Sequence, residues 1–213
     1  MSGLLKRAES RPSDYCFPNK LEDIRVLRFA IHQGCAARAG YYLGNLFYDR
    51  LQWDEALALW EDSARADADF PTVFRNLSLV YYNKCREPQK AREAMEKAFS
   101  LDPSDVRIFL ELDQLYKKLG WSFEERLANF EEHKELIGGR DDLYIEYITL
   151  INMCGDHEMA YECIMGRKFH PWEGGEGKIT AQYTIALLEM AKKELGQSRG
   201  SKGVLPESCG GNG

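Results

Sequence analysis

The stretch Ala37–Phe70, ARAGYYLGNLFYDRLQWDEALALWEDSARADADF, is followed by Pro71–Asp105, PTVFRNLSLVYYNKCREPQKAREAMEKAFSLDPSD, and the second stretch repeats the first. The aligned positions match in character, at an offset of 34 in the first half and 35 in the second: Leu43 with Leu77, Phe47 with Tyr81, Ala56 with Ala91, and Trp60 with Met95. We therefore predict one extra residue in the mid-repeat turn of the second copy. Repetition at this period indicates a stack of similar supersecondary units.

A third copy occupies 106–140, where Leu112 and Tyr116 continue the series at an offset of 35. This copy departs from the pattern at two positions. Arg126 fills the position that is a small alanine in the first two copies, and His133 fills the next alanine position, seven residues later. We expect looser packing or a shifted turn here, with His133 as a packed or surface residue rather than a ligand.

The fourth copy, 141–165, places Gly155 in the turn and Ala160 at the small-residue position. Each copy has the apolar spacing of two amphipathic helices of about 13 residues. The first helix of the first copy shows this spacing at Tyr42, Leu43, Leu46 and Phe47. Pro71 and Pro88 suit first helical turns, and no segment alternates like a strand. The sequence therefore predicts an all-α fold in which antiparallel helix pairs stack.

This pattern resembles the tetratricopeptide repeat (TPR) family, which implies a right-handed α-solenoid with a C-terminal capping helix. A more specific resemblance rests on FPNKLEDIRVL, YYLGNLFYD, LDQLYKKLG, RDDLYIEYITL and KFHPWEGGEGK. Together these look like the C-terminal TPR region of certain large bacterial proteins that carry an N-terminal β-rich domain of unknown function. The resemblance implies a bacterial origin and allows this chain to be one part of a longer protein.

The repeats divide the chain into an expected set of segments. Leu21 to Gln33 is predicted to be the second helix of a partial repeat, with its apolar face covered by Tyr15–Pro18 or by a preceding domain. The expected boundaries are a flexible segment at 1–14 and one solenoid at 15–195, followed by a disordered tail at 196–213. Within the solenoid we expect a partial repeat at 15–36, repeats at 37–70, 71–105, 106–140 and 141–165, a loop at 166–178, and a capping helix at 179–195.

Composition excludes several classes of function. The 213 residues carry a formal net charge of −6 and a sequence pI near 5.4, which argues against general nucleic-acid binding. No apolar run approaches the length of about 18 residues that a membrane span needs. The six cysteines have no CxxC spacing and suit a reducing environment. We expect a cytoplasmic protein that needs no cofactor and binds neither nucleic acid nor membrane.

The stretch KFHPWEGGEGK, Lys168–Lys178, has the composition of a site but lacks the spacing of one. A phosphate-binding P-loop needs GxxxxGK[ST] after a strand, and His170 has no partner at zinc-ligand spacing. Glu173 and Glu176 could act as an acid/base pair, but the three glycines around them make the segment a poor rigid support for catalysis. We favour a structural turn in which Phe169 and Trp172 plug a gap in the core. Anion binding in the glycine-rich part, 173–178, remains open.

We expect a non-catalytic scaffold that binds a peptide or a neighbouring domain. The alternative is a helical accessory region of a carbohydrate-active bacterial enzyme. The resemblance places a binding groove on the first helices of the repeats. The alternative is that this surface is an ordinary solvated helix face. The predicted groove residues are Arg38, Tyr41, Asn45, Tyr48, Arg75, Asn76, Leu79, Tyr82, Arg107, Gln114 and Lys117.

Such a surface suits a peptide with an acidic or C-terminal carboxylate end. Some TPR proteins hold terminal carboxylates with two asparagines and three basic residues. Asn45 and Asn76 match the asparagines, and Arg107 matches one basic position, whereas Tyr41 and Glu111 occupy the other two. The resemblance therefore implies an incomplete clamp, and we expect the chaperone-tail ligand of clamp proteins to bind weakly or not at all.

Overall fold

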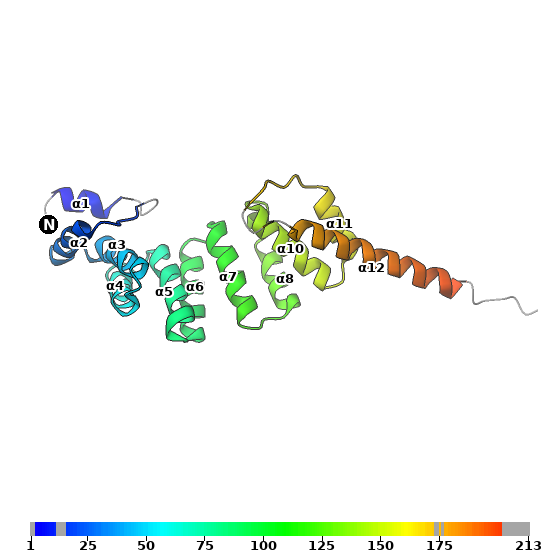
Figure 1. The fold of residues 1–213 in the computed structure, drawn as a ribbon, viewed down its shortest axis with the longest axis horizontal. Helices are drawn as coiled ribbons and strands as arrows, with labels where there is room; N and C mark the ends of the chain where they lie inside the picture. Colours follow the sequence, from blue (N-terminus) through cyan, green and yellow to red (C-terminus); the bar gives the residue numbers. More distant parts are fainter. Residues whose placement is uncertain (1–2, 12–15, 173–174, 176, 202–213) are drawn as a thin grey trace, which may run out of the picture. The chain divides into compact units, whose positions relative to one another are not determined.

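A computed structural model describes residues 3–11, 16–172, 175 and 177–201, and every regular element among them is helical (Figure 1). The all-α fold class is therefore confirmed. The helices are α1 (Gly3–Glu9), α2 (Leu21–His32), α3 (Ala36–Asp49), α4 (Trp53–Ala66), α5 (Pro71–Val80), the π-helix η1 (Tyr81–Cys85), α6 (Pro88–Leu101), α7 (Val106–Lys118), α8 (Phe123–Glu132), α9 (Lys134–Ile137), α10 (Asp141–Met153), α11 (His157–Met165) and α12 (Lys178–Ser201).

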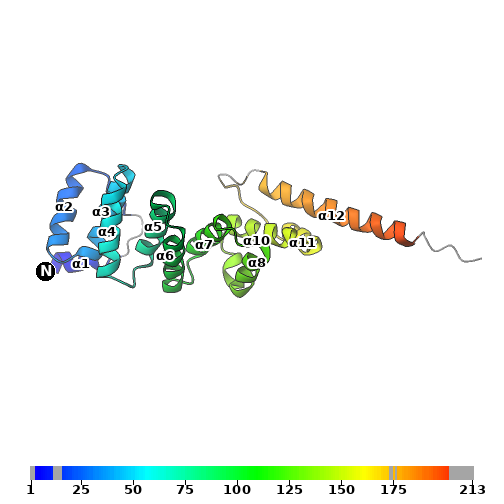
Figure 2. The ribbon, with the colours of Figure 1, turned by 90° about the horizontal axis from the view of Figure 1, so that it is seen from below.

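The chain divides into two compact units, one ending at Gly120 and the other beginning at Trp121. This differs from the single unit expected over 15–195. In the first unit α3 pairs with α4, and α5 pairs with α6, so the repeats predicted at 37–70 and 71–105 each form one helix pair (Figure 2). The unit boundary falls inside the repeat predicted at 106–140. Ala56 and Ala91 are both fully buried, as the predicted register requires of close helix contacts.

The contact between α3 and α4 depends on a glycine facing a tryptophan. A Cβ atom at Gly44 would collide with the indole of Trp60, which is 2% exposed. In the next repeat the corresponding positions hold Ser78 and Met95, both buried. A slightly larger residue on the first helix of the second repeat is thus matched by a narrower residue on its second helix, as close packing requires.

The extra residue of the second repeat lies in η1, where the end of α5 widens into a π-helix. A π-turn accommodates one additional residue without breaking the helix. The chain then turns at Arg86, which has a positive φ of 59°, as Leu51 does in the first repeat at 62°. The insertion predicted for the turn is therefore absorbed mainly in the last turn of the helix that precedes it.

The N-terminal region differs from the expectation of a flexible segment at 1–14, because Gly3–Glu9 forms helix α1. A carboxylate oxygen of Glu9 accepts a hydrogen bond of 3.0 Å from the backbone N–H of Arg38 in the first turn of α3. This contact satisfies a helix N-terminal donor with a negative charge, which stabilises the helix. Leu5 packs against a small buried cluster around Cys35.

Helix α2 confirms the helix predicted from Leu21, and its inner face packs on the core of the first repeat through Ile24, Leu27 and Ile31. The predicted cover was wrong in part. Phe17 is 74% exposed, so it does not shield α2, and Tyr15 lies outside the described residues. The inner side of α2 is covered by α3, and Leu5 of α1 packs against the same small cluster around Cys35 as Leu27 and Ile31.

In the second unit Arg126 is buried, at 1% exposure, although its position was expected to pack loosely. Its guanidinium donates to Glu146 of α10 at 2.8 Å, so the buried charge is paired. Ser122 and Glu125 cap α8 reciprocally in a capping box. At His133 the backbone leaves the helical conformation and separates α8 from the short α9. The irregularity predicted for this repeat is thus a break in its second helix.

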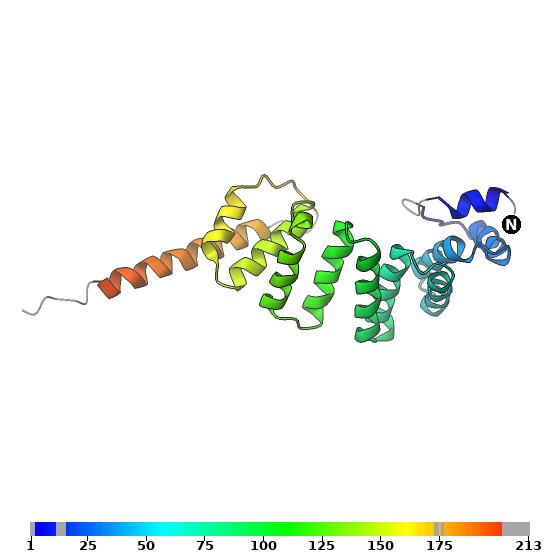
Figure 3. The same cartoon turned by 180° about the vertical axis from the view of Figure 1, so that it is seen from behind.

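Helix α12 begins at Lys178, close to the predicted start of the capping helix, and packs on α10 and α11 (Figure 3). Its fully buried contact is Ala186, and Tyr183 lies beside Tyr161 with ring centroids 5.8 Å apart. The helix continues to Ser201, beyond the expected end at 195. The rest of the expected tail, 202–213, lies outside the described residues.

The glycine–tryptophan contact leads to a stability prediction. We expect Gly44→Ala to lower the free energy of unfolding by about 1–3 kcal/mol, because the new methyl group overpacks Trp60. Chemical denaturation would measure this. Gly196→Ala is the matched control, since Gly196 lies in α12 with no neighbour near its Cβ position, and it should be neutral or stabilising by up to about 1 kcal/mol. Equal stability of Gly44→Ala and wild type would contradict the packing account.

Candidate functional site

The largest candidate binding site described in the first unit is a groove of about 760 Å³. It is formed by the first helices of the repeats, α3 and α5, together with the start of α7 and parts of two connecting segments. Its lining residues are Phe17, Tyr41, Asn45, Tyr48, Asp49, Leu51, Trp60, Thr72, Arg75, Asn76, Leu79 and Arg107.

The structure brings most of the predicted groove residues together. Those that line the groove are Tyr41, Asn45, Tyr48, Arg75, Asn76, Leu79 and Arg107. Tyr82 and Gln114 instead line a smaller neighbouring pocket of about 50 Å³, which Leu79 also touches. Lys117 lines neither cavity. The sequence did not predict Phe17, Leu51 or Trp60, because two lie in connecting segments and Trp60 belongs to a second helix.

Arg38 does not line the groove, in contrast to the prediction. Its guanidinium carbon lies 3.6 Å from the centroid of the Phe70 ring, and its side chain forms an ion pair of 3.4 Å with Asp67. Both partners belong to the end of the first repeat. Arg38 therefore ties α3 to the turn after α4 through a cation–π contact and a charge pair.

The two asparagines form a ladder across the floor of the groove. The side-chain amide of Asn76 donates to the Oδ1 atom of Asn45 at 2.9 Å, and the indole N–H of Trp60 donates to the same oxygen at 3.2 Å. The Trp60 N–H also lies 3.1 Å from the Tyr41 carbonyl oxygen. The two asparagines therefore join neighbouring helices, α3 and α5, by a side-chain hydrogen bond. Asn45 is also held in one orientation by the buried Trp60 indole.

Charges on the groove are paired. Arg75 binds both carboxylate oxygens of Glu111 at 2.5 Å, in the bidentate geometry that guanidinium groups favour. Arg107 also donates to Glu111, at 3.2 Å. The side chain of Arg107 is 63% exposed, whereas Arg75 is 16% exposed. Glu111 thus neutralises one guanidinium and leaves Arg107 as the accessible positive group, which agrees with an incomplete carboxylate clamp.

In the second unit, the carboxylate of Asp141 anchors the start of the stretch Lys168–Lys178 and the arginine before it. Arg167 donates to it at 2.7 Å, and the backbone N–H of His170 donates at 2.8 Å. The His170 imidazole lies 3.2 Å from the same carboxylate. The backbone bond from His170, together with the Arg167 and His170 side chains, holds the pKa of Asp141 below its ordinary value. His170 is therefore a structural contact in this turn.

The aromatic residues of the stretch were predicted to plug a gap in the core, but the structure does not bury them fully. Phe169 and Trp172 are both half-buried. The Phe169 ring packs edge-on against Tyr144 at 6.0 Å and lies 6.4 Å from the Trp172 ring. Gly175 lies so close to Trp172 that a side chain there would collide with the indole. Glu173 and Glu176, the conceivable acid/base pair, lie outside the described residues.

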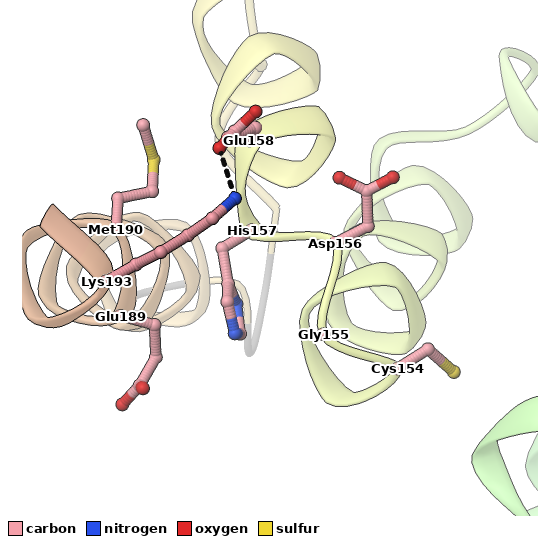
Figure 4. A pocket seen from close by; sticks show the side chains of 8 residues that line it. All are labelled: Cys154, Gly155, Asp156, His157, Glu158, Glu189, Met190 and Lys193. Carbon is pink, nitrogen blue, oxygen red and sulfur yellow. Dashed lines mark hydrogen bonds and ion pairs between the residues drawn. The ribbon is translucent and has the colours of Figure 1, made fainter. Parts of the chain in front are cut away.

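A pocket of about 280 Å³ lies between the α10–α11 turn and α12 (Figure 4). Lys193 of α12 donates to Glu158 of α11 at 2.8 Å across it. The Asn152 amide donates to Gln182 of α12, so its oxygen faces the Nδ1–H of His157. These contacts hold α12 against the last repeat.

Within the described ranges, no three histidine, cysteine or acidic side chains converge in a way that would hold a metal ion. Of the helices that the structure describes, none combines the length and apolar character needed to cross a bilayer.

Comparison with known proteins identifies the fold. No family model matches the sequence. The crystal structure of YrrB, a TPR protein with an unusual peptide-binding site, is similar at 18% identity and a TM-score of 0.59, over 80% of this chain and 85% of YrrB. The crystal structure of MamA matches at 15% identity and a TM-score of 0.52, over 80% of this chain and 82% of MamA. These likenesses confirm the predicted TPR fold.

The Asp141 anchor gives a pH-dependent prediction. Asp141→Asn should lower the free energy of unfolding at neutral pH by about 1.5–3 kcal/mol, because charge-assisted hydrogen bonds are lost. Since the folded carboxyl has the lower pKa, its stabilisation is complete above the ordinary pKa of about 4 and is lost as pH falls through the folded pKa. The gap between wild type and variant should therefore close in acid.

Urea unfolding of both proteins across this pH range would measure the gap. Asp62→Asn is a suitable control, because the Asp62 carboxylate is an exposed partner of Arg65 and should contribute less than about 1 kcal/mol. A difference between Asp141→Asn and wild type that stays constant down to the lowest pH would show that the carboxylate charge is not what anchors the turn.

Proposed function

We propose that the protein is a non-catalytic interaction module, and that the groove of the first unit binds an extended peptide, supplied by a partner protein or by a neighbouring domain. The observation that carries this proposal is the convergence of seven predicted groove residues on one cavity in the TPR fold. The peptide-binding site of YrrB is a property of that protein, but it gives a precedent for this use of the fold.

The chemistry of the groove suits a peptide. Tyr41, Tyr48 and Leu79 offer apolar and aromatic surface, while Asn45 and Thr72 offer hydrogen-bonding groups between them. Aromatic side chains contribute large contact areas at low entropic cost. The asparagine ladder is already fixed by its own hydrogen bonds, so binding requires little reordering of the floor. A preformed groove is a feature of binding sites that work without a large conformational change.

Arg107 gives the groove its electrostatic preference. It is the exposed guanidinium of the lining, and its pairing with Glu111 uses only one of its donor groups in the described contacts. A partner carboxylate can therefore approach it while Arg75 remains bound to Glu111. The more specific resemblance to bacterial proteins with a β-rich domain, the bacterial origin and the cytoplasmic location stay predictions.

Selection of random peptides displayed on phage against the full chain would test this function. We expect enriched peptides to contain an acidic residue, and we expect Arg107→Ala to weaken their binding about tenfold or more, as loss of a hydrogen bond between charged groups implies. Arg65→Ala is the matched control, since Arg65 is an exposed arginine of the same unit outside the groove. Its affinity for the peptides should match that of wild type.

Failure to enrich any peptide, or equal affinities of Arg107→Ala and wild type for every enriched peptide, would contradict the proposed function. An accessory region of a carbohydrate-active enzyme would give a different result. Thermal stabilisation of the chain by an oligosaccharide, together with no peptide recovered, would favour an accessory region of a carbohydrate-active enzyme.

A further inference from the structure

One position of the repeat adopts a left-handed backbone in every copy. Leu51, Arg86, Gly120 and Gly155 follow one another at intervals of 35, 34 and 35 residues, and each lies directly after the first helix of its repeat. Their φ angles are 62°, 59°, 84° and 92°. Glycine adopts this conformation without steric penalty, whereas residues with a side chain are disfavoured in it.

The hydrogen bonds of the turn impose the left-handed conformation on Leu51. Its N–H donates to the Tyr48 carbonyl at 3.0 Å, and the N–H of Gln52 donates to the Phe47 carbonyl at 2.9 Å. Gly155 and Asp156 make the same pair of bonds at the end of α10. This is the Schellman arrangement, whose left-handed position is usually glycine. Leu51 therefore occupies a glycine position at a cost in backbone strain.

Burial does not offset that strain, because Leu51 is 73% exposed. Its side chain instead lines the groove, at the end where α3 finishes. Phe17, which is 74% exposed, lines the same groove from the segment before α2. That segment is tied to the end of α3 by a hydrogen bond of 2.8 Å from the Arg50 guanidinium to the Asn19 carbonyl. Two large, exposed apolar side chains thus share the lining of the groove with Tyr48.

The groove therefore has two chemically different parts. Phe17, Tyr48 and Leu51 form an apolar part at the end of α3, which we call the apolar rim. Arg107, at the start of α7, supplies an exposed positive charge two helices further along the first-helix series. An occupant that complements both parts needs a large apolar side chain and a carboxylate on one extended segment.

We propose that the apolar rim receives a large aliphatic or aromatic side chain of an extended partner peptide, and that Leu51 is retained at a glycine position for this contact. The inference rests on the proposed function of the groove and adds to it the chemistry of the partner. The partner peptide carries a leucine-like or aromatic anchor for the rim and an acidic residue for Arg107.

Replacement of Leu51 by glycine separates the two roles of this residue. We expect Leu51→Gly to raise Tm by about 2–4 °C, because the strain of the turn is relieved. The same variant should bind the phage-selected peptides about tenfold more weakly, because a buried leucine contact is lost. Arg86→Gly is the matched control, because it relieves the backbone strain at the same turn position in a residue outside the groove. Its Tm should rise, while its affinity for the peptides stays unchanged.

A double-mutant cycle tests whether the peptide anchor meets Leu51. In each selected peptide the large apolar residue is replaced by alanine, and affinities are measured against wild type and Leu51→Gly. We expect the replacement to weaken binding to wild type about tenfold and to have much less effect on Leu51→Gly, since groups in contact are not additive. Phe17→Ser should show coupling of the same sign.

The possible failures are distinguishable. Two results would overturn the apolar rim and leave the groove function in place. The selected peptides could depend on Arg107 but share no large apolar residue, or the effects of replacing that residue and of Leu51→Gly on the binding free energy could be additive. A fall in Tm for Leu51→Gly would also overturn the inference, because Leu51 would then serve the fold itself. Recovery of no peptide, or of peptides indifferent to both Arg107 and Leu51, would overturn the inference together with the proposed function.

Discussion

The close contact between the two helices of a repeat is the constraint on which the first unit depends. Gly44 admits the Trp60 indole, and Ala56 lies fully buried in the same helix pair. A helix pair that approaches this closely buries its apolar faces without voids, which is where most of its stability arises. The contact also has a functional consequence, because the N–H of the same indole fixes Asn45 in the groove. Core packing and groove geometry are therefore joined through one side chain.

The groove is rigid where it meets the core and open where it meets solvent. Asn45 and Asn76 bond to each other, and Arg75 is held by Glu111, so the floor is ordered before any partner arrives. Arg107 and Leu51 are exposed and lie at different ends of the first-helix series. A fixed floor with exposed contact groups favours binding of a flexible peptide, since most of the ordering entropy is then confined to the ligand.

The sequence predicted the repeats and most groove positions, because small residues, prolines and apolar spacing are local signals. It missed α1, whose position depends on a contact between Glu9 and Arg38, 29 residues apart. It also misjudged Arg126, since the burial of a charge becomes favourable only through Glu146 of another helix. The left-handed backbone of Leu51 was visible only in the structure, although its alignment with the turn glycines of later repeats was a signal in the sequence.

Binding of a peptide in the groove of the first unit can be followed by backbone amide chemical-shift mapping of the full chain, titrated with a phage-selected peptide. We expect perturbations concentrated on the groove faces of α3 and α5 and on the first turn of α7, with α11 and α12 unchanged. Perturbations centred on the pocket between the α10–α11 turn and α12, with none in the groove, would contradict this proposal.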